Sequence, residues 1–202
     1  MNLVKTLGAV TAVVTLVGSA AMADSMSGMA LHSRYGGPVY TGAPALNVTA
    51  SLVEAGGGGD NFSIATALTS MVGADLTNAE VTKLTKQYGK DNVDSWITVF
   101  NFAVPDSLDK ATKAGVTLPA PDLSGKQLAA TLVSAGLDSH GVFYTEFLLD
   151  KAVTHDIHMA VMDDIDSKYG APADTNYHRI TNQAMVDLAN ALGAKAKLAK
   201  LH

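Results

Sequence analysis

The sequence predicts an all-α fold, a compact bundle of about six helices preceded by an irregular segment rich in glycine and proline. From Phe62 onward, apolar residues recur every three or four positions, which is the period of an amphipathic helix. Glycine or proline ends nearly every such run, and no run alternates apolar and polar residues as a half-buried strand does. These patterns divide the chain into residues 1–23, 24–60, 61–193 and 194–202.

Residues 1–23 have the pattern of a signal peptide. Lys5 supplies a positive charge, and the uncharged run from Leu7 to Val17 is too short to span a bilayer. The small residues Ala21 and Ala23 form a cleavage pattern, so we expect cleavage after Ala23. No later apolar run is long enough for a membrane span. We therefore expect a periplasmic or secreted protein with no membrane span after the signal is removed.

Composition excludes several classes of site. The 202 residues carry a formal net charge of −5 and include no cysteine. Disulfides, thiolate zinc sites, iron–sulfur clusters and covalently attached c-type haem all require cysteine. A mildly acidic chain also lacks the basic face that sequence-independent nucleic-acid binding needs. The protein is therefore expected to be stable through its core alone and to bind no nucleic acid.

Residues 24–60 are predicted to be an irregular leader. The segments Gly36–Pro38 and Gly56–Gly59 oppose regular structure, although Val48–Val53 could form a short strand or a single helical turn. The helical domain is expected at residues 61–193. Its first helix should begin near Asp60–Phe62 and end at Gly73.

The next segments are defined by capping and breaking residues. Thr77–Glu80 matches a capping box and predicts the start of a helix that ends at Gly89. The third helix should begin at Asp91 or Asn92 and be interrupted at Pro105, because proline lacks a backbone donor. A short helical piece to Gly115 and an extended connector at Leu118–Pro121 are then expected.

Three further helices complete the predicted bundle. Ser124 should cap a helix that stops at Gly136. The longest run, Val142–Tyr169, predicts one continuous helix, and Pro172 suits the first turn of a last helix that ends near Leu192. Residues 194–202 form a lysine-rich tail.

Histidine and methionine side chains gather in the longest predicted helix. His155, Met159 and Met162 share one helical stripe, and His158 lies on the neighbouring stripe. His178 could face them from the last helix if the two helices pack antiparallel. Imidazole and thioether groups are ligands for haem iron and copper. His155 and His158 are therefore the leading metal ligands, although the same residues could equally form a solvated face or fill the core.

These observations predict an exported, non-enzymatic protein that binds haem or a metal ion through the histidines and methionines. The alternative is a structural or protein-interaction module of the bacterial periplasm, without a cofactor, that docks through residues 33–59. An enzyme with a histidine base is a third possibility, but no residue stands out as its nucleophile. Hydrolase elbow, phosphate-binding loop and zinc-protease motifs are absent from the sequence.

Overall fold

The computed structural model describes residues 43–134, 149, 153 and 155–193, and these residues contain helices and no strand. The prediction of an all-α bundle is therefore confirmed. The elements, in chain order, are α2 (Ala43–Ala55), the short 3-10 helix η1 (Gly59–Asn61), α3 (Ile64–Val72), α4 (Ala74–Tyr88), α5 (Lys90–Lys113), α6 (Gly125–Ser134), α8 (Asp156–Tyr169) and α9 (Ala171–Ala191).

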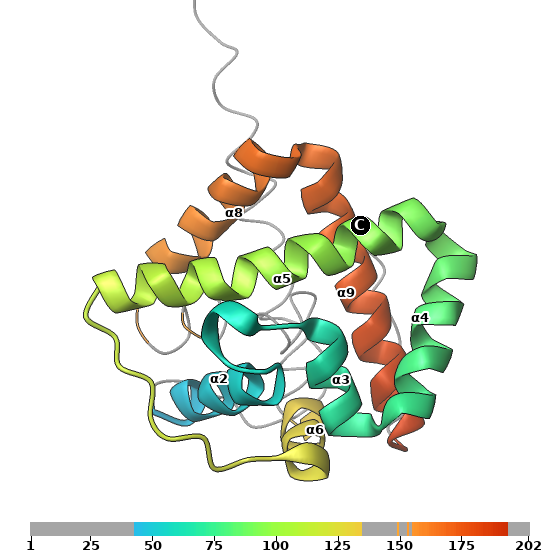
Figure 1. Cartoon of the computed structure of the whole chain (residues 1–202), viewed down its shortest axis with the longest axis horizontal. Helices are drawn as coiled ribbons and strands as arrows, with labels where there is room; N and C mark the ends of the chain where they lie inside the picture. Colours follow the sequence, from blue (N-terminus) through green and yellow to red (C-terminus); the bar gives the residue numbers. More distant parts are fainter. Residues whose placement is uncertain (1–42, 135–148, 150–152, 154, 194–202) are drawn as a thin grey trace, which may run out of the picture.

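Helix α5 runs through the middle of the bundle, and the other helices lie around it (Figure 1). It packs against α3, α4, α8 and α9. Helices α2, α3 and α6 contact one another on one side of α5, whereas α8 and α9 form a connected pair that packs on it elsewhere. Helix α4 closes the bundle by contacting α3, α5 and α9. The central position of α5 explains why most of its apolar residues are buried.

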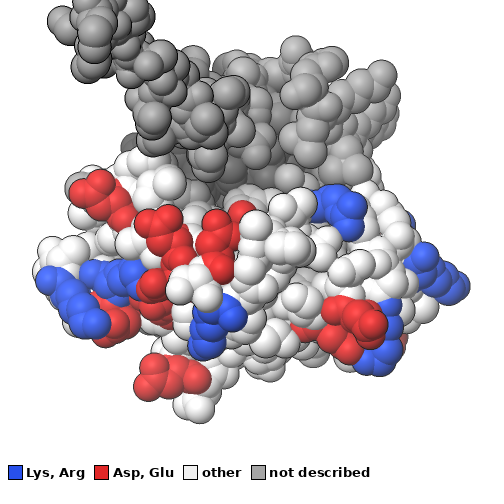
Figure 2. All heavy atoms as spheres, turned by 90° about the horizontal axis from the view of Figure 1, so that it is seen from above, with Lys and Arg blue, Asp and Glu red and all other residues white. Residues whose placement is uncertain are grey.

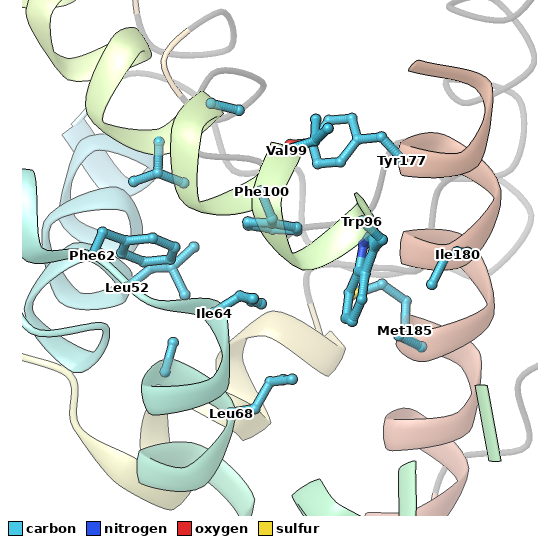
Figure 3. Packing of buried hydrophobic residues seen from close by; sticks show 14 of the residues in the cluster. Leu52, Phe62, Ile64, Leu68, Trp96, Val99, Phe100, Tyr177, Ile180 and Met185 are labelled. Atoms are coloured by element: carbon cyan, nitrogen blue, oxygen red, sulfur yellow. The ribbon is translucent and has the colours of Figure 1, made fainter. Parts of the chain in front are cut away.

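The main core is built around Phe100 of α5 (Figure 3). Its ring centroid lies 6.3 Å from that of Phe62, 6.1 Å from that of Trp96 and 5.4 Å from that of Tyr177. The latter two contacts are edge-to-face, an arrangement that aromatic quadrupoles favour. Aromatic packing therefore ties α5 to α9 and to the loop before α3.

A buried hydrogen bond also joins α5 to α9. The indole Nε1 of Trp96 donates to Thr181 Oγ1 over 2.9 Å. Trp96 is 2% exposed and Thr181 is fully buried, so neither group can turn to water. A buried donor without an acceptor is costly, and Thr181 therefore fixes both the tryptophan orientation and the position of α9.

Thr181→Val is expected to lower the free energy of unfolding by about 1–3 kcal/mol, because valine keeps the shape but leaves the indole N–H without its acceptor. Urea unfolding followed by Trp96 fluorescence measures the loss. Thr98→Val is the matched control, since Thr98 is exposed and its Oγ1 bonds only to Asp94 O within the same helix. A Thr181→Val protein as stable as Thr98→Val would show that the indole finds another acceptor.

The prediction of an irregular leader is wrong for residues 43–55, which form α2. Leu52 is fully buried and Val48 is 1% exposed, so the apolar face of α2 belongs to the main core. Pro44 does not prevent the helix, because it lies in the first turn, where no backbone donor is needed. Residues 24–42 lie outside the described residues. Part of the segment 33–59, through which the alternative interaction module would dock, is therefore buried in the core.

The predicted capping box at Thr77–Glu80 is also wrong. Helix α4 already begins at Ala74, immediately after the Gly73 that ends α3. Thr77 Oγ1 donates to Gly73 O over 2.9 Å rather than accepting from a free backbone donor. Glu80 therefore lies in the second turn of α4, where it faces the interior.

Pro105 does not interrupt the third predicted helix. Helix α5 is continuous from Lys90 to Lys113 and contains Pro105 in its interior. A proline inside a helix costs about 3 kcal/mol. Val104 and Ser107, on either side of it, are fully buried, so packing along both halves of α5 offsets that cost.

The last two helices partly match the prediction. Helix α9 begins at Ala171 with Pro172 in its first turn, as expected. The continuous helix from Val142 is wrong, because Val153 forms a bend, His155 is a turn residue and α8 begins at Asp156. Residues 142–148 lie outside the described residues. The candidate histidines therefore lie at the start of a helix rather than in the middle of one.

Charged side chains of both signs are dispersed over the surface. The face shown in Figure 2 carries small groups of Asp and Glu with Lys and Arg nearby. One group of ion pairs links two helices: Lys110 of α5 contacts Asp106 over 2.8 Å and also contacts Asp164 of α8. Within the described part of the chain, no helix has the length and apolar character that crossing a membrane requires.

Candidate histidine site

The structure brings His155 and His158 together at the start of α8. Their ring centroids are 5.9 Å apart, and the ring planes are tilted by 33°. His155 precedes the helix and is exposed, whereas His158 is only 8% exposed. His158 shares its helix face with Val161 and Ile165, both fully buried, as the predicted stripe required. The pair therefore has one imidazole at the surface and one at the edge of the core.

The two methionines of the predicted site have different surroundings. Met159 is 36% exposed, whereas Met162 is partly buried and packs against the main core. Met159 follows His155 by four residues, and Met162 follows His158 by four, so each lies one helical turn from a histidine. A thioether thus accompanies each imidazole, and the solvent-facing one is Met159.

The structure does not bring His178 to this pair. His178 Nδ1 lies 3.0 Å from Asp174 O and 3.2 Å from Asp174 Oδ1, within its own helix α9. Desolvation and the charges of Asp174 and Asp163 raise the pKa of Asp166, while His178 opposes them, so His178 lies near Asp166. A helix rises about 1.5 Å per residue, which places Asp166 roughly 12 Å beyond His158 along α8.

The ring separation would let both histidines share one metal ion, but it does not let them hold one haem between them. Metal–imidazole bonds of about 2.0–2.1 Å allow two rings that share an ion to have centroids up to roughly 6 Å apart. The observed 5.9 Å lies within this limit. A haem bound by both rings would have to pass between them, where the backbone of α8 joins the two residues.

The sequence also suggests apolar walls for a ligand pocket near the histidines, formed by Phe100, Phe102, Phe143, Tyr144 and Phe147. Phe143, Tyr144 and Phe147 lie outside the described residues, whereas Phe100 belongs to the main core and Phe102 packs against it. An apolar pocket among α3, α6 and α9 has an accessible volume of about 10 Å³, room for roughly one water. Its lining residues are Met71, Val72, Ala129, Leu132, Met185, Leu188 and Leu192. None of the predicted ligands lines this pocket.

Sequence reasoning missed a second polar cluster, between α4 and α9. Glu80 is 8% exposed, and the Asp187 side chain is 9% exposed. Lys83 Nζ lies 2.5 Å from Asp187 Oδ1. Burial raises the pKa of Glu80 to about 8; the charge of Asp187 and a hydrogen bond to it add to this shift, and Lys83 opposes it. A carboxyl group with such a pKa holds its proton at neutral pH.

Comparisons with known proteins leave the site to be judged on its geometry. Among the described residues, no group of three or more His, Cys, Asp or Glu side chains is arranged to hold a metal ion. The histidine pair alone would therefore need further ligands, such as water or a thioether, to complete a coordination shell. No protein-family model matches the sequence, and neither the curated proteins nor the solved structures give a match.

Proposed function

We propose that this is an exported, non-enzymatic binding protein that holds a transition-metal ion through His155 and His158. The single observation that carries the proposal is the 5.9 Å separation of the two rings. Copper suits the site best, because imidazole and thioether donors lie within one helical turn of each other. Met159 is the thioether that a bound ion would meet from solvent, since it is the more exposed methionine.

The accessibility of the pair supports binding over a purely structural role. His155 is exposed and lies immediately before α8, so an ion can reach it without unfolding the core. His158 is held by the packing of α8, which fixes one ligand in advance and lowers the ordering cost of binding. An ion bound here would bridge an exposed ligand, His155, and a largely buried one, His158.

His155→Ala combined with His158→Ala is expected to abolish stoichiometric copper binding. Each single substitution should weaken it by more than the 10–100-fold that loss of an outer-shell partner costs. Copper titration of the purified protein, followed by absorbance and by competition with a chelator, measures the affinity. His178→Ala is the matched control and should bind as the unaltered protein does, because His178 is on α9, near the end of α8 that is far from His155 and His158.

Three outcomes would count against the proposal. Copper binding that survives the double substitution would remove both histidines from the site. An absorption band of haem in protein purified from cells would favour haem over a metal ion. Protein recovered from the cytoplasmic fraction with its first residues intact would contradict export, for which the expected mature end is Asp24.

A further inference from the structure

A polar seam runs along the contact between α4 and α9 and continues into α5. The polar seam is a set of paired polar side chains. Along it, residue numbers rise from Glu80 on one side and fall from Asp187 on the other, so α4 and α9 are antiparallel. Its contacts are Lys83 Nζ to Asp187 Oδ1 at 2.5 Å, Gln87 Nε2 to Gln183 Oε1 at 3.3 Å, the Arg179 guanidinium 4.9 Å from the Tyr88 ring centroid, and Asn176 Nδ2 to Asn92 Oδ1 at 2.9 Å.

Glu80 and Asp187 form the most deeply buried step of this polar seam. Glu80 Oε1 and Asp187 Oδ2 are both buried and have no donor among the described atoms. An ionised carboxylate accepts hydrogen bonds but cannot donate one, so two ionised carboxylates cannot satisfy each other. A single proton on the pair supplies the missing donor, since a protonated carboxyl donates to an ionised one.

The surrounding charges do not remove the need for this proton. The charged and titratable groups that act on Glu80 and its neighbours are Lys83 and Tyr88 on α4 and Arg179 and Asp187 on α9. Helices α3 and α5 also pack on α4; α3 has no titratable side chain, and the charged groups that act on Glu80 include none from α5. Lys83 neutralises one carboxylate of the pair, so a second ionised carboxylate would be a buried, uncompensated charge.

We propose that Glu80 and Asp187 share one proton across the polar seam, and that loss of this proton loosens α9 from α4. The pair then acts as a pH-sensitive latch, closed at neutral and acidic pH and opened by alkali. Like charges that cannot both be ionised at close range are separated either by protonation or by movement of their helices.

The sign of the effect on stability follows from proton linkage. The pKa of the Glu80 carboxyl group is about 8 in the folded protein, against an ordinary pKa of 4.5. Its contribution to stability is fully present below pH 4.5, declines as the pH rises because the unfolded chain loses the proton first, and is lost above about pH 8. Within this window the unfolding constant should rise by up to about tenfold per pH unit.

Glu80→Gln tests the latch, because glutamine stays neutral and keeps a donor for Asp187. Urea unfolding between pH 5 and pH 9.5 should show a steep pH dependence in the unaltered protein that Glu80→Gln lacks. At pH 9 the unfolding constant of Glu80→Gln should be at least about tenfold lower than that of the unaltered protein. Glu54→Gln is the matched control and should keep the steep dependence, since Glu54 is exposed on α2.

Two direct measurements on the unaltered protein test the proposal even if Glu80→Gln fails to fold. Carbon-13 spectra of the glutamate carboxyl groups should contain one resonance that titrates near pH 8; titration of every glutamate near pH 4.5 would overturn the shared proton. Amide hydrogen exchange of the unaltered protein, corrected for the intrinsic pH dependence of exchange, should show less protection in α4 and α9 at pH 9 than at pH 6, with no such change in α8. Unchanged protection in α4 and α9 would overturn the loosening.

Discussion

Phe100→Ala is expected to lower the free energy of unfolding by about 4 kcal/mol, within the range found for truncating a buried phenylalanine. Phe100 is fully buried and contacts three aromatic rings: Trp96 of its own helix, Phe62 before α3, and Tyr177 of α9 (Figure 3). The cost has two sources, the lost transfer of the ring from water and the cavity that remains. The neighbouring rings are large and rigid, so they cannot collapse into that cavity.

Phe102→Ala is the matched control for this prediction, because it makes the same chemical change two residues further along α5. Phe102 is only partly buried, and its ring meets Tyr169 at 5.5 Å and the Lys168 ammonium at 4.0 Å. Its truncation should cost less than half as much as that of Phe100. Urea unfolding measures both losses, and equal losses would show that Phe100 is not the centre of the core.

The ends of helices could be predicted because their signals are local. Gly89 ends α4 and Gly170 ends α8, and both have a positive φ, of 86° and 83°, which glycine adopts without strain. Pro172 starts α9 for an equally local reason, since its fixed φ suits the first turn. Such residues dictate their own backbone whatever the rest of the chain does.

The errors arose where packing between distant segments outweighs a local signal. The glycine- and proline-rich composition of residues 24–60 obscured α2, whose helical form depends on burying Val48 and Leu52 against other helices. Pro105 is tolerated because buried residues flank it on both sides. Local propensity is a weak guide at such positions, because tertiary contacts override it.

The candidate sites also differ in whether their signal is local or depends on contacts between distant segments. The His155–His158 pair was visible because a spacing of three residues brings two side chains together on any helix. Glu80 was assigned a capping role because its true partner, Asp187, lies on another helix far along the sequence. A buried acidic residue can be recognised from sequence only when the helix face it shares is known, and that required the correct start of α4 at Ala74.

Among the described glycines, Gly56 has the least room for a side chain, and this predicts a second large effect. A Cβ atom on Gly56 would lie 2.3 Å from Cδ2 and 2.4 Å from Cε2 of Phe62. Real Cβ atoms do not approach other atoms this closely, so the ring would have to move. Phe62 is 4% exposed and stacks on Phe100, which leaves it no free space. Gly56→Ala is therefore expected to lower the free energy of unfolding by about 3 kcal/mol, the upper end for overpacking.

A comparison within the same glycine run separates this clash from backbone strain. A Cβ on Gly58 would meet no atom within 4 Å, but its φ of 80° is unfavourable for alanine, so Gly58→Ala should cost about 1–2 kcal/mol. Phe62→Leu should partly relieve Gly56→Ala, because a smaller side chain leaves room for the added methyl group. The double variant should therefore lose less stability than the sum of the two single losses, by at least about 0.5 kcal/mol. Strict additivity would show that the two positions do not collide and that the cost at Gly56 comes from its own backbone.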